Sequence, residues 1–270
     1  MFATQNDLNW DVIKRDLFVK VGGEDIKVPG KVAQVRDDNY DVVGITSNSY
    51  EVFQNSQLRE LVAPMVGEGL LEITNIGFLG NGNKVFLQAQ MAQDYKVVGE
   101  EHRGMLTLLN SHDGSSTLAA GITDTRVICS NTFASAMSSF DHRIRHNSDI
   151  HVNALNITET IDYVNDGMRV FAENAEKLAL APCDVETLDS LISYAFNKDA
   201  ETVRARNTIV KFFRNGVGNQ GISLWDGLNG LTQWVSHNSM KNENRRFASA
   251  NFGKGADVSR RFMKAALATV

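Results

Sequence analysis

The stretch Ser111–Phe133 reads SHDGSSTLAAGITDTRVICSNTF, and it joins a polar segment to an apolar one. The pair Asp113-Gly114 is typical of a tight turn, because Asp hydrogen-bonds turn backbone and Gly adopts left-handed dihedral angles. The run LAAGITDTRVICS then alternates as a strand does, so Arg126 and Val127 would face opposite sides. We therefore predict a hairpin turn followed by a core strand.

Strands and turns continue on the N-terminal side of this stretch. β-Branched runs lie on both sides of the turn signal Asp37-Asp38-Asn39, and two apolar runs flank Gly80-Asn81-Gly82-Asn83, which predicts a β-hairpin. Two further strands are expected around Gly99–His102. One helix is predicted between these strands, capped by Asn55, and its apolar face comprises Leu58, Leu61, Val62 and Met65.

The second half of the chain has a different period. From Thr132 onward the pattern becomes helical, and from about Asn156 it is mainly helical. Asp184 is expected to cap a helix with Thr187 at its third position, and the last helix is expected to begin near Asp257. We therefore predict an α+β fold: an antiparallel, hairpin-rich sheet with a packed helix in the N-terminal half, and a helical C-terminal half. The expected parts are residues 1–150 and 151–270, packed together as one unit.

Composition limits the class of protein. The chain has 270 residues, a net charge of −5 and two cysteines. Cys129 and Cys183 are too few for a disulfide framework or a zinc cluster, and they predict free thiols in a reducing cytoplasm. We see no signal peptide and no apolar run of roughly 20 residues, so we expect no membrane partner.

Charge is unevenly distributed along the chain. Residues 241–270 hold seven basic residues against two acidic ones, so this end carries +5 and residues 1–240 carry −10. A basic end suits a polyanion or an acidic neighbouring subunit. The basic residues are Lys241, Arg245, Arg246, Lys254, Arg260, Arg261 and Lys264.

Two short motifs resemble ligand sites. Gly216, Gly218 and Gly221 have dinucleotide-loop spacing, but they follow a helical pattern rather than a strand, so we predict a helix end and a loop. His142 and His146 have the spacing of metal ligands on a helix.

Cations lie between these two histidines. Arg143 and Arg145 would repel a metal ion, so we expect no metal and no cofactor. The alternatives are a basic surface that suits phosphates, or a plain solvated loop.

His112 and Asp113 allow three interpretations. They could belong to a catalytic site, to a ligand-binding surface, or to the turn itself. Adjacent strand residues point to opposite faces, and no nucleophile elbow is present, so the turn is favoured over catalysis.

Aromatic residues add one more alternative. Trp225 and Trp234 are expected in the helical core. Tyr40, Tyr50 and Phe53 lie among the hairpins and could stack on bases, or pack in the core or at an edge.

Several blocks in order resemble a known family. They are YDVVGITSNSYEVFQNSQLRELV, LLNSHDGSSTLAAGITDTRVICSNTF, LWDGLNGLTQWVSHNS and RRFASANFGKGADVSRRFMKAAL. Together they are similar to the phage/plasmid-like family whose domain is catalogued as domain of unknown function 932, over about Val35 to Leu267. Leu228 stands where that family usually has tyrosine, which we interpret as a packing change. The matching positions are Tyr50, Gln54, Asn55, His112, Asp113, Gly114, Ser115, Arg126, Val127, Cys129, Asn131, Thr132, Trp225, His237, Phe252 and Gly253.

The resemblance implies a setting in phages, prophages or plasmids, and hence in the cytoplasm of a bacterial host. The predicted meander of hairpins followed by a packing helix also resembles, in topology only, the Rad52-like single-strand annealing proteins. Those proteins form rings and hold single-stranded DNA in a basic groove, so the likeness implies a homo-oligomer.

Three functions remain open at this point. The first is binding or annealing of single-stranded DNA in replication or recombination. The second is a non-enzymatic protein that targets a host factor, and the third is a hydrolase or nuclease that uses His112 and Asp113. The residues expected to contact nucleic acid are Arg126, Arg143, Arg145, Arg245, Arg246, Lys254, Arg260 and Arg261.

Overall fold

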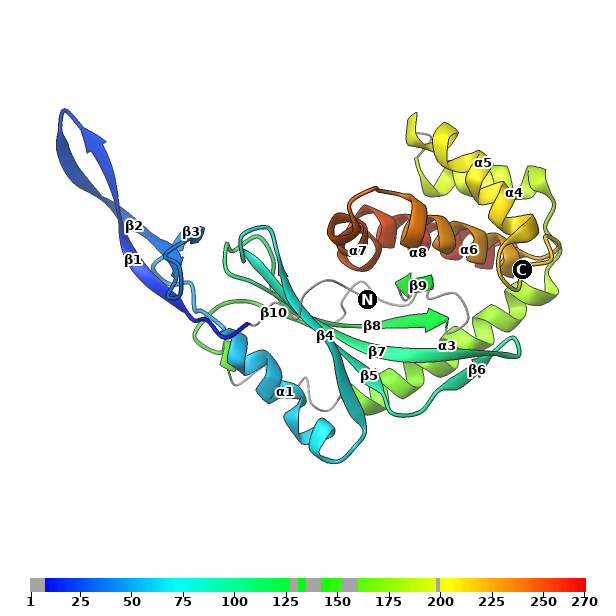
Figure 1. The fold of residues 1–270 in the computed structure, drawn as a ribbon, viewed down its shortest axis with the longest axis horizontal. Helices are drawn as coiled ribbons and strands as arrows, with labels where there is room; N and C mark the ends of the chain where they lie inside the picture. Colours follow the sequence, from blue (N-terminus) through cyan, green and yellow to red (C-terminus); the bar gives the residue numbers. More distant parts are fainter. Residues whose placement is uncertain (1–7, 127–130, 135–141, 152–159, 198–199) are drawn as a thin grey trace. The chain divides into compact units, whose positions relative to one another are not determined.

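The computed structural model describes residues 8–126, 131–134, 142–151, 160–197 and 200–270 (Figure 1). The chain forms two compact units that interleave along the sequence. Unit 1 comprises Met1–Ala92, Leu106–Gly121 and Phe140–Ile161, and unit 2 comprises Gln93–Met105, Ile122–Ser139 and Asp162–Val270. The two sequence-predicted parts, residues 1–150 and 151–270, stay a prediction of the domain boundaries.

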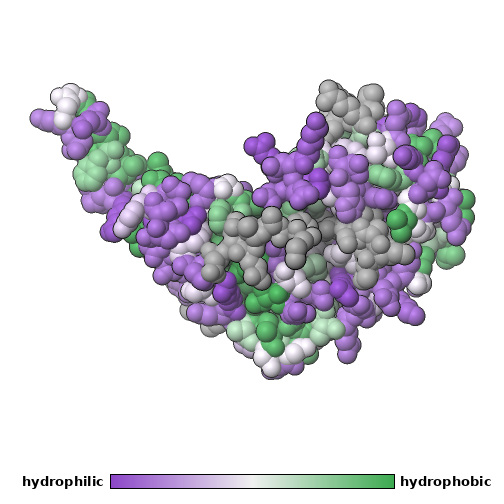
Figure 2. Space-filling view, in the orientation of Figure 1, coloured by the Kyte–Doolittle hydropathy of each residue, from purple (hydrophilic) through white to green (hydrophobic). Residues whose placement is uncertain are grey.

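Unit 1 contains a three-stranded antiparallel sheet, of strand order β1-β2-β3. The strands are β1 (Val12–Val21), β2 (Glu24–Arg36) and β3 (Val42–Ser47). Gly22 and Gly23 connect β1 to β2 with φ of 60° and 94°, and a two-residue hairpin turn of this kind favours glycine. The distal half of this hairpin extends away from β3 as a projecting arm (Figure 1), and apolar side chains lie on its surface (green in Figure 2).

A second, seven-stranded antiparallel sheet has the order β10-β8-β7-β5-β4, with β6 paired to β7 and β9 paired to β8. Its strands are β4 (Leu71–Leu79), β5 (Lys84–Met91), β6 (Tyr95–Val97), β7 (Glu100–Ser111), β8 (Leu118–Arg126), β9 (Asn131–Ala134) and β10 (His142–Ile144). The hairpin predicted around Gly80–Asn83 is therefore confirmed as the β4–β5 connection. The turn expected around Gly99–His102 is shorter than predicted, because β7 already begins at Glu100.

Helix α1 (Asn55–Gly67) buries the four apolar residues that its periodicity predicted. The cap is one residue earlier than expected: it is Gln54, whose backbone N–H donates to Gln57 Oε1 at 2.7 Å. Asn55 is instead a fully buried first helical residue, and its Nδ2 donates to the carbonyl of Trp10 at 2.9 Å. A tertiary contact, rather than a cap, therefore accounts for Asn55.

Helices make up most of unit 2, as expected for the C-terminal half. They are α3 (Thr160–Leu180), α4 (Val185–Ala195), α5 (Ala200–Asn215), α6 (Leu224–Gln233), the π-helical turn η2 (Trp234–Asn238), α7 (Glu243–Phe252) and α8 (Lys254–Leu267). Their apolar faces share one core, which includes Phe171, Ile192, Phe213, Trp225 and Phe262. None of the helices in the described ranges is long and apolar enough to cross a membrane.

Asp184 caps α4 as predicted, and its side chain accepts a hydrogen bond from the backbone N–H of Thr187 at 2.8 Å. The last helix begins three residues earlier than predicted, at Lys254. Gly253 adopts extended backbone between α7 and α8, so a new helix starts directly after it.

The helical pattern expected from Thr132 onward is wrong for two segments. Residues 131–134 form β9, where Thr132 lies opposite Thr125, and residues 142–144 form β10, where His142 lies opposite Ala120. Both strands are very short and pair with the same strand, β8. Periodicity within three or four residues cannot distinguish helix from strand, so their pairing decides the structure.

Gly44 on β3 lies very close to the backbone of another segment of unit 1. A Cβ atom at this position would lie 2.4 Å from the Cα of Asp113 and 2.7 Å from the carbonyl oxygen of His112. The strand can therefore contact the turn after β7 only with glycine at residue 44.

We predict that Gly44→Ala lowers the free energy of unfolding by about 1–3 kcal/mol, because backbone must move to admit the methyl group. Gly67→Ala is the matched control, since its Cβ would meet no atom within 4 Å. Urea unfolding of both variants measures the difference. Equal stability of the two variants would contradict the close approach.

Candidate functional site

The turn after β7 places His112 in the interior. Its side chain is fully buried, its Nε2–H donates to Asn55 Oδ1 at 3.0 Å, and its ring meets the Trp10 ring edge-on at 5.6 Å. Burial, and next the neighbouring His146, lower the pKa of His112 to about 3, while Asp113 opposes this. The imidazole is therefore neutral and inaccessible to a substrate in solution.

Asp113 serves the turn itself. Its carboxylate accepts hydrogen bonds from Asn83 Nδ2 at 2.7 Å and from the backbone N–H of Ser115 at 2.9 Å. Burial opposes ionisation, but these hydrogen bonds outweigh it and hold the pKa of Asp113 below its ordinary value. Gly114 follows with φ of 72°, so these two residues lie in a turn between β7 and β8, while the choice among the three interpretations stays a prediction.

The histidine pair at residues 142 and 146 does not lie on a helix. His142 begins β10, whereas His146 lies in a turn, where its Nδ1–H donates to the carbonyl of Glu51 at 2.9 Å. The His146 ring stacks on Tyr50 at 4.6 Å. The helical metal-ligand spacing is therefore wrong, and no group of three His, Cys, Asp or Glu residues within the described ranges could hold a metal ion.

Arg143 and Arg145 are both exposed at this edge of the sheet. They lie two residues apart, in β10 and directly after it, so extended backbone directs both side chains to the same side. Arg126 ends β8, and its side chain lies outside the part of the chain that the structure describes, as does Cys129.

The basic residues of α7 and α8 divide into two groups. Arg246 forms hydrogen bonds with two backbone carbonyl groups. Its Nε donates to the carbonyl of Ser236 at 2.9 Å, and one terminal nitrogen donates to the carbonyl of Met240 at 2.7 Å. Arg260 forms an ion pair with Asp257. These two side chains stabilise the fold, which the sequence pattern alone did not reveal.

Other cations of this segment face solvent. Lys241, Arg245, Lys254 and Lys264 are exposed, and Arg261 is half-buried. We call residues 241–264 the basic segment. Its exposed side chains can bind phosphate, since phosphate contacts need accessible positive charge.

The aromatic candidates are mostly buried. Trp225 and Trp234 belong to the core of unit 2, and Tyr50 and Phe53 to the interior of unit 1. Tyr40 is 73% exposed and is the member of the predicted stacking set that bases could reach.

A buried polar cluster in unit 2 escaped sequence analysis. Asp124 on β8 accepts a hydrogen bond from the hydroxyl of Tyr95 and lies 2.6 Å from Nδ1 of His102. Asp124 and His102 are both buried, and burial raises the pKa of Asp124 above its ordinary value. An acidic residue within the apolar run LAAGIT–TR was the signal that could have revealed it. The cluster joins β6, β7 and β8.

The glycine-containing loop after α5 has a carboxylate bonded to three of its backbone N–H groups. It follows a helix, as predicted, and the carboxylate of Asp226 already accepts the backbone N–H groups of Gln220, Ile222 and Ser223 at 3.1–3.2 Å. A carboxylate therefore fills the place where a dinucleotide-binding loop would hold its pyrophosphate.

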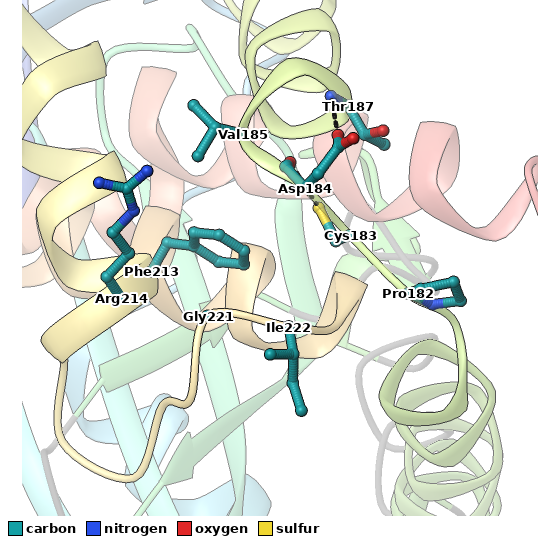
Figure 3. Close-up of a pocket in the computed structure, with 9 residues that line it drawn as sticks. All are labelled: Pro182, Cys183, Asp184, Val185, Thr187, Phe213, Arg214, Gly221 and Ile222. Carbon is teal, nitrogen blue, oxygen red and sulfur yellow. Dashed lines mark hydrogen bonds between the residues drawn. The ribbon is translucent and has the colours of Figure 1, made fainter.

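An open pocket of about 550 Å³ lies beside the start of α4 (Figure 3). Its thiol, Cys183, is buried, and burial raises the pKa of that thiol to about 11, so it is protonated near neutral pH. The carboxylate of Asp184 accepts a hydrogen bond from the backbone N–H of Thr187 (dashed in Figure 3), so this side chain is engaged as the cap of α4. The pocket therefore offers no activated nucleophile.

The fold and these sites define a mixed α/β protein, with antiparallel sheets in the N-terminal half and a basic helical end. The chain belongs to the family described as Domain of unknown function (DUF932), which matches residues 42–259. No curated protein and no solved structure matches the chain. The resemblance to this family is confirmed, whereas the phage or plasmid origin and the Rad52-like topology stay predictions.

We predict that acid destabilises unit 1 through His112. A histidine whose pKa is lowered by folding contributes its full stability above its unfolded pKa of about 6.5, and loses it as the pH falls toward the folded value of about 3. The loss has a slope of up to about 1.4 kcal/mol per pH unit for this one residue. His146 shifts in the same direction.

Urea unfolding at pH 7.5 and at pH 4.5 measures this loss. His112→Gln keeps a donor toward Asn55 and removes the titrating group, so its stability should fall less between the two pH values. An equal fall in both proteins would contradict the assignment.

We also predict that Arg246→Gln lowers the free energy of unfolding by about 1–3 kcal/mol, because charged hydrogen bonds to two carbonyls are lost. Arg245→Gln is the control at the neighbouring exposed position, and it should change stability by less than about 0.5 kcal/mol. Thermal or urea unfolding distinguishes the two. An unstable Arg245 variant beside a stable Arg246 variant would reverse the assignment.

Proposed function

We propose that this protein binds single-stranded nucleic acid, with the basic segment as its main contact. The observation that carries this proposal is the exposure of Lys241, Arg245 and Lys264. These side chains make no ion pair with any described residue. Binding to phosphates can therefore use their charge without breaking a contact of the fold.

Local charge matters more here than net charge. The chain is acidic overall, but residues 241–270 carry +5. Charges separated by more than about 10 Å are largely screened at 0.1 M salt, so a strand bound at this segment interacts mainly with the cations beside it. Arg143 and Arg145 provide a second exposed pair in unit 1 that can contact phosphate.

A single strand is favoured over a duplex by the setting that the family resemblance implies. The predicted resemblance in topology to single-strand annealing proteins, which hold single-stranded DNA in a basic groove, supports the same choice. Exposed Tyr40 adds an aromatic ring on which an unpaired base can stack. The contacts of His112 and Asp113 favour a structural role over the hydrolase or nuclease alternative.

The test is fluorescence anisotropy with a labelled single strand of ~30 nucleotides and its duplex, at low and high salt. We expect tighter binding to the single strand and a steep loss of affinity with salt, because bound cations release counterions. Arg245→Glu combined with Lys264→Glu should weaken binding by at least about tenfold, by removing two cations and adding two anions.

The matched control is Lys177→Glu combined with Lys211→Glu. Both lysines are exposed on α3 and α5, outside the basic segment, and the net charge changes equally. Equal weakening by both double variants would show that only net charge matters. Absence of binding at low salt would overturn the proposal and favour a protein that targets a host factor.

A further inference from the structure

The projecting arm of unit 1 consists of residues 16–27, the distal part of the β1–β2 hairpin. β3 pairs with β2 only over Lys31–Val35, so the arm has two strands (Figure 1). Isolated two-stranded hairpins are marginally stable in water. The arm also leaves the outer edge of β1 without a neighbouring strand among the described residues.

The two faces of the arm differ in chemistry. Val19 lies opposite Ile26, and Val21 shares their face; the three side chains are 48%, 48% and 57% exposed. An exposed apolar face next to an open strand edge is typical of a surface that pairs with another strand.

The opposite face carries charges in cross-strand pairs. Lys20 lies 3.9 Å from Asp25, and Lys27 lies 2.8 Å from Asp16. Phe18 lies between them on the same face and is 51% exposed. The order of these charges along β1 determines which strand can pair with its edge.

We propose that the arm binds the same arm of a second copy, with β1 antiparallel to β1 about a two-fold axis at Phe18. In an antiparallel pair, two directly opposite residues belong to the same kind of pair, hydrogen-bonded or not. A two-fold axis between two copies of β1 must therefore set one residue opposite its own copy, and we call that residue the centre. Six centres lie on β1 within the arm, from Asp16 to Val21, and an axis at Val21 creates no ion pair because it sets Lys20 opposite Gly22 of the turn. An axis at Asp16 or at Lys20 sets like charges opposite each other, and an axis at Leu17 sets Lys14 opposite the partner's Lys20.

The remaining two centres differ in charge pairing. An axis at Val19 creates no ion pair. An axis at Phe18 sets Asp16 opposite the partner's Lys20, and symmetry makes this pair twice. It also brings Phe18 to the partner's Phe18 and Val19 to the partner's Leu17, so ring and aliphatic surfaces meet across the edge.

Charge complementarity then extends over four strands. The row Asp25, Lys20, the partner's Asp16 and the partner's Lys27 alternates in sign at every step. The existing pairs Lys20–Asp25 and Lys27–Asp16 form its two ends. The charged face of the arm is thus complementary to itself, which specifies a second copy rather than an unrelated strand.

Sedimentation of the full chain over a range of concentrations tests the pairing. We expect a dimer that forms as concentration rises. Asp16→Lys should raise its dissociation constant by about tenfold or more, because two attractive pairs become repulsive. Reversal of the whole row, Asp16→Lys and Lys20→Asp with Asp25→Lys and Lys27→Asp, should restore it, because every pair then stays attractive. Glu24→Lys is the control, since it makes the same charge change on β2, opposite Val21 and outside the charged row.

Cysteine cross-linking tests the register. Phe18→Cys brings two thiols together on the axis, so mild oxidation should yield a covalent dimer. Val21→Cys is the control, because this register separates the two copies of residue 21 by six positions along the strand. Equal cross-linking of both variants would overturn the register.

A monomer at every concentration would overturn the proposal itself. If that monomer binds neutral lipid vesicles and Val19→Ser with Ile26→Ser abolishes the binding, the apolar face serves a membrane instead. Neither result depends on nucleic-acid binding, because the arm shares no residue with the basic segment.

Discussion

The end of β7 is held against the start of α1 by three neighbouring hydrogen-bonded contacts, and the arrangement of unit 1 depends on them. Asn110 Nδ2 donates to the carbonyl of Phe53 at 2.8 Å, the hydroxyl of Tyr50 donates to the carbonyl of Ser111, and His112 donates to Asn55. All of these groups are buried, so a shift of one residue would leave several polar atoms without partners. Each such atom costs about 1–3 kcal/mol.

This constraint explains why the polar turn resembles an active site. A histidine, an aspartate and serines occur together because the turn must satisfy buried backbone, and not because a substrate is present. Burial that makes His112 useful to the fold also prevents it from meeting a ligand. Buried or half-buried carboxylates have the same structural role in unit 2. Asp226 accepts hydrogen bonds from three N–H groups of the loop before α6. Asp124 on β8 contacts Tyr95 on β6 and His102 on β7, so it joins three strands.

Surfaces available for function are therefore found away from these buried polar contacts. The basic segment exposes Lys241, Arg245 and Lys264, which make no ion pair with any described residue, and the arm exposes an apolar face and an open strand edge. If both proposals hold, pairing of two arms gives one particle two basic segments. Two linked contacts on one strand bind more tightly than either alone, provided that the strand can reach both.

Local patterns predicted the elements whose stability is local. The glycine- and asparagine-rich hairpin at Gly80–Asn83, the Asp184 cap and the apolar face of α1 all follow from neighbouring residues, because turns, caps and amphipathic faces depend on spacing along the chain. Family membership was also evident from ordered blocks. The overall α+β arrangement needed no more than these signals.

Other features were decided only by tertiary structure. β9 and β10 exist because β8 pairs with them, and Asn55 is buried because Trp10 accepts its amide. Arg246 differs from Arg245 because its guanidinium donates to the carbonyls of Ser236 and Met240, which precede the helix. Arg245 and Arg246 are adjacent and of the same type, so the sequence pattern alone does not distinguish them. Their roles differ because burial and hydrogen-bond partners come from other parts of the fold, which spacing within one helix or strand does not encode.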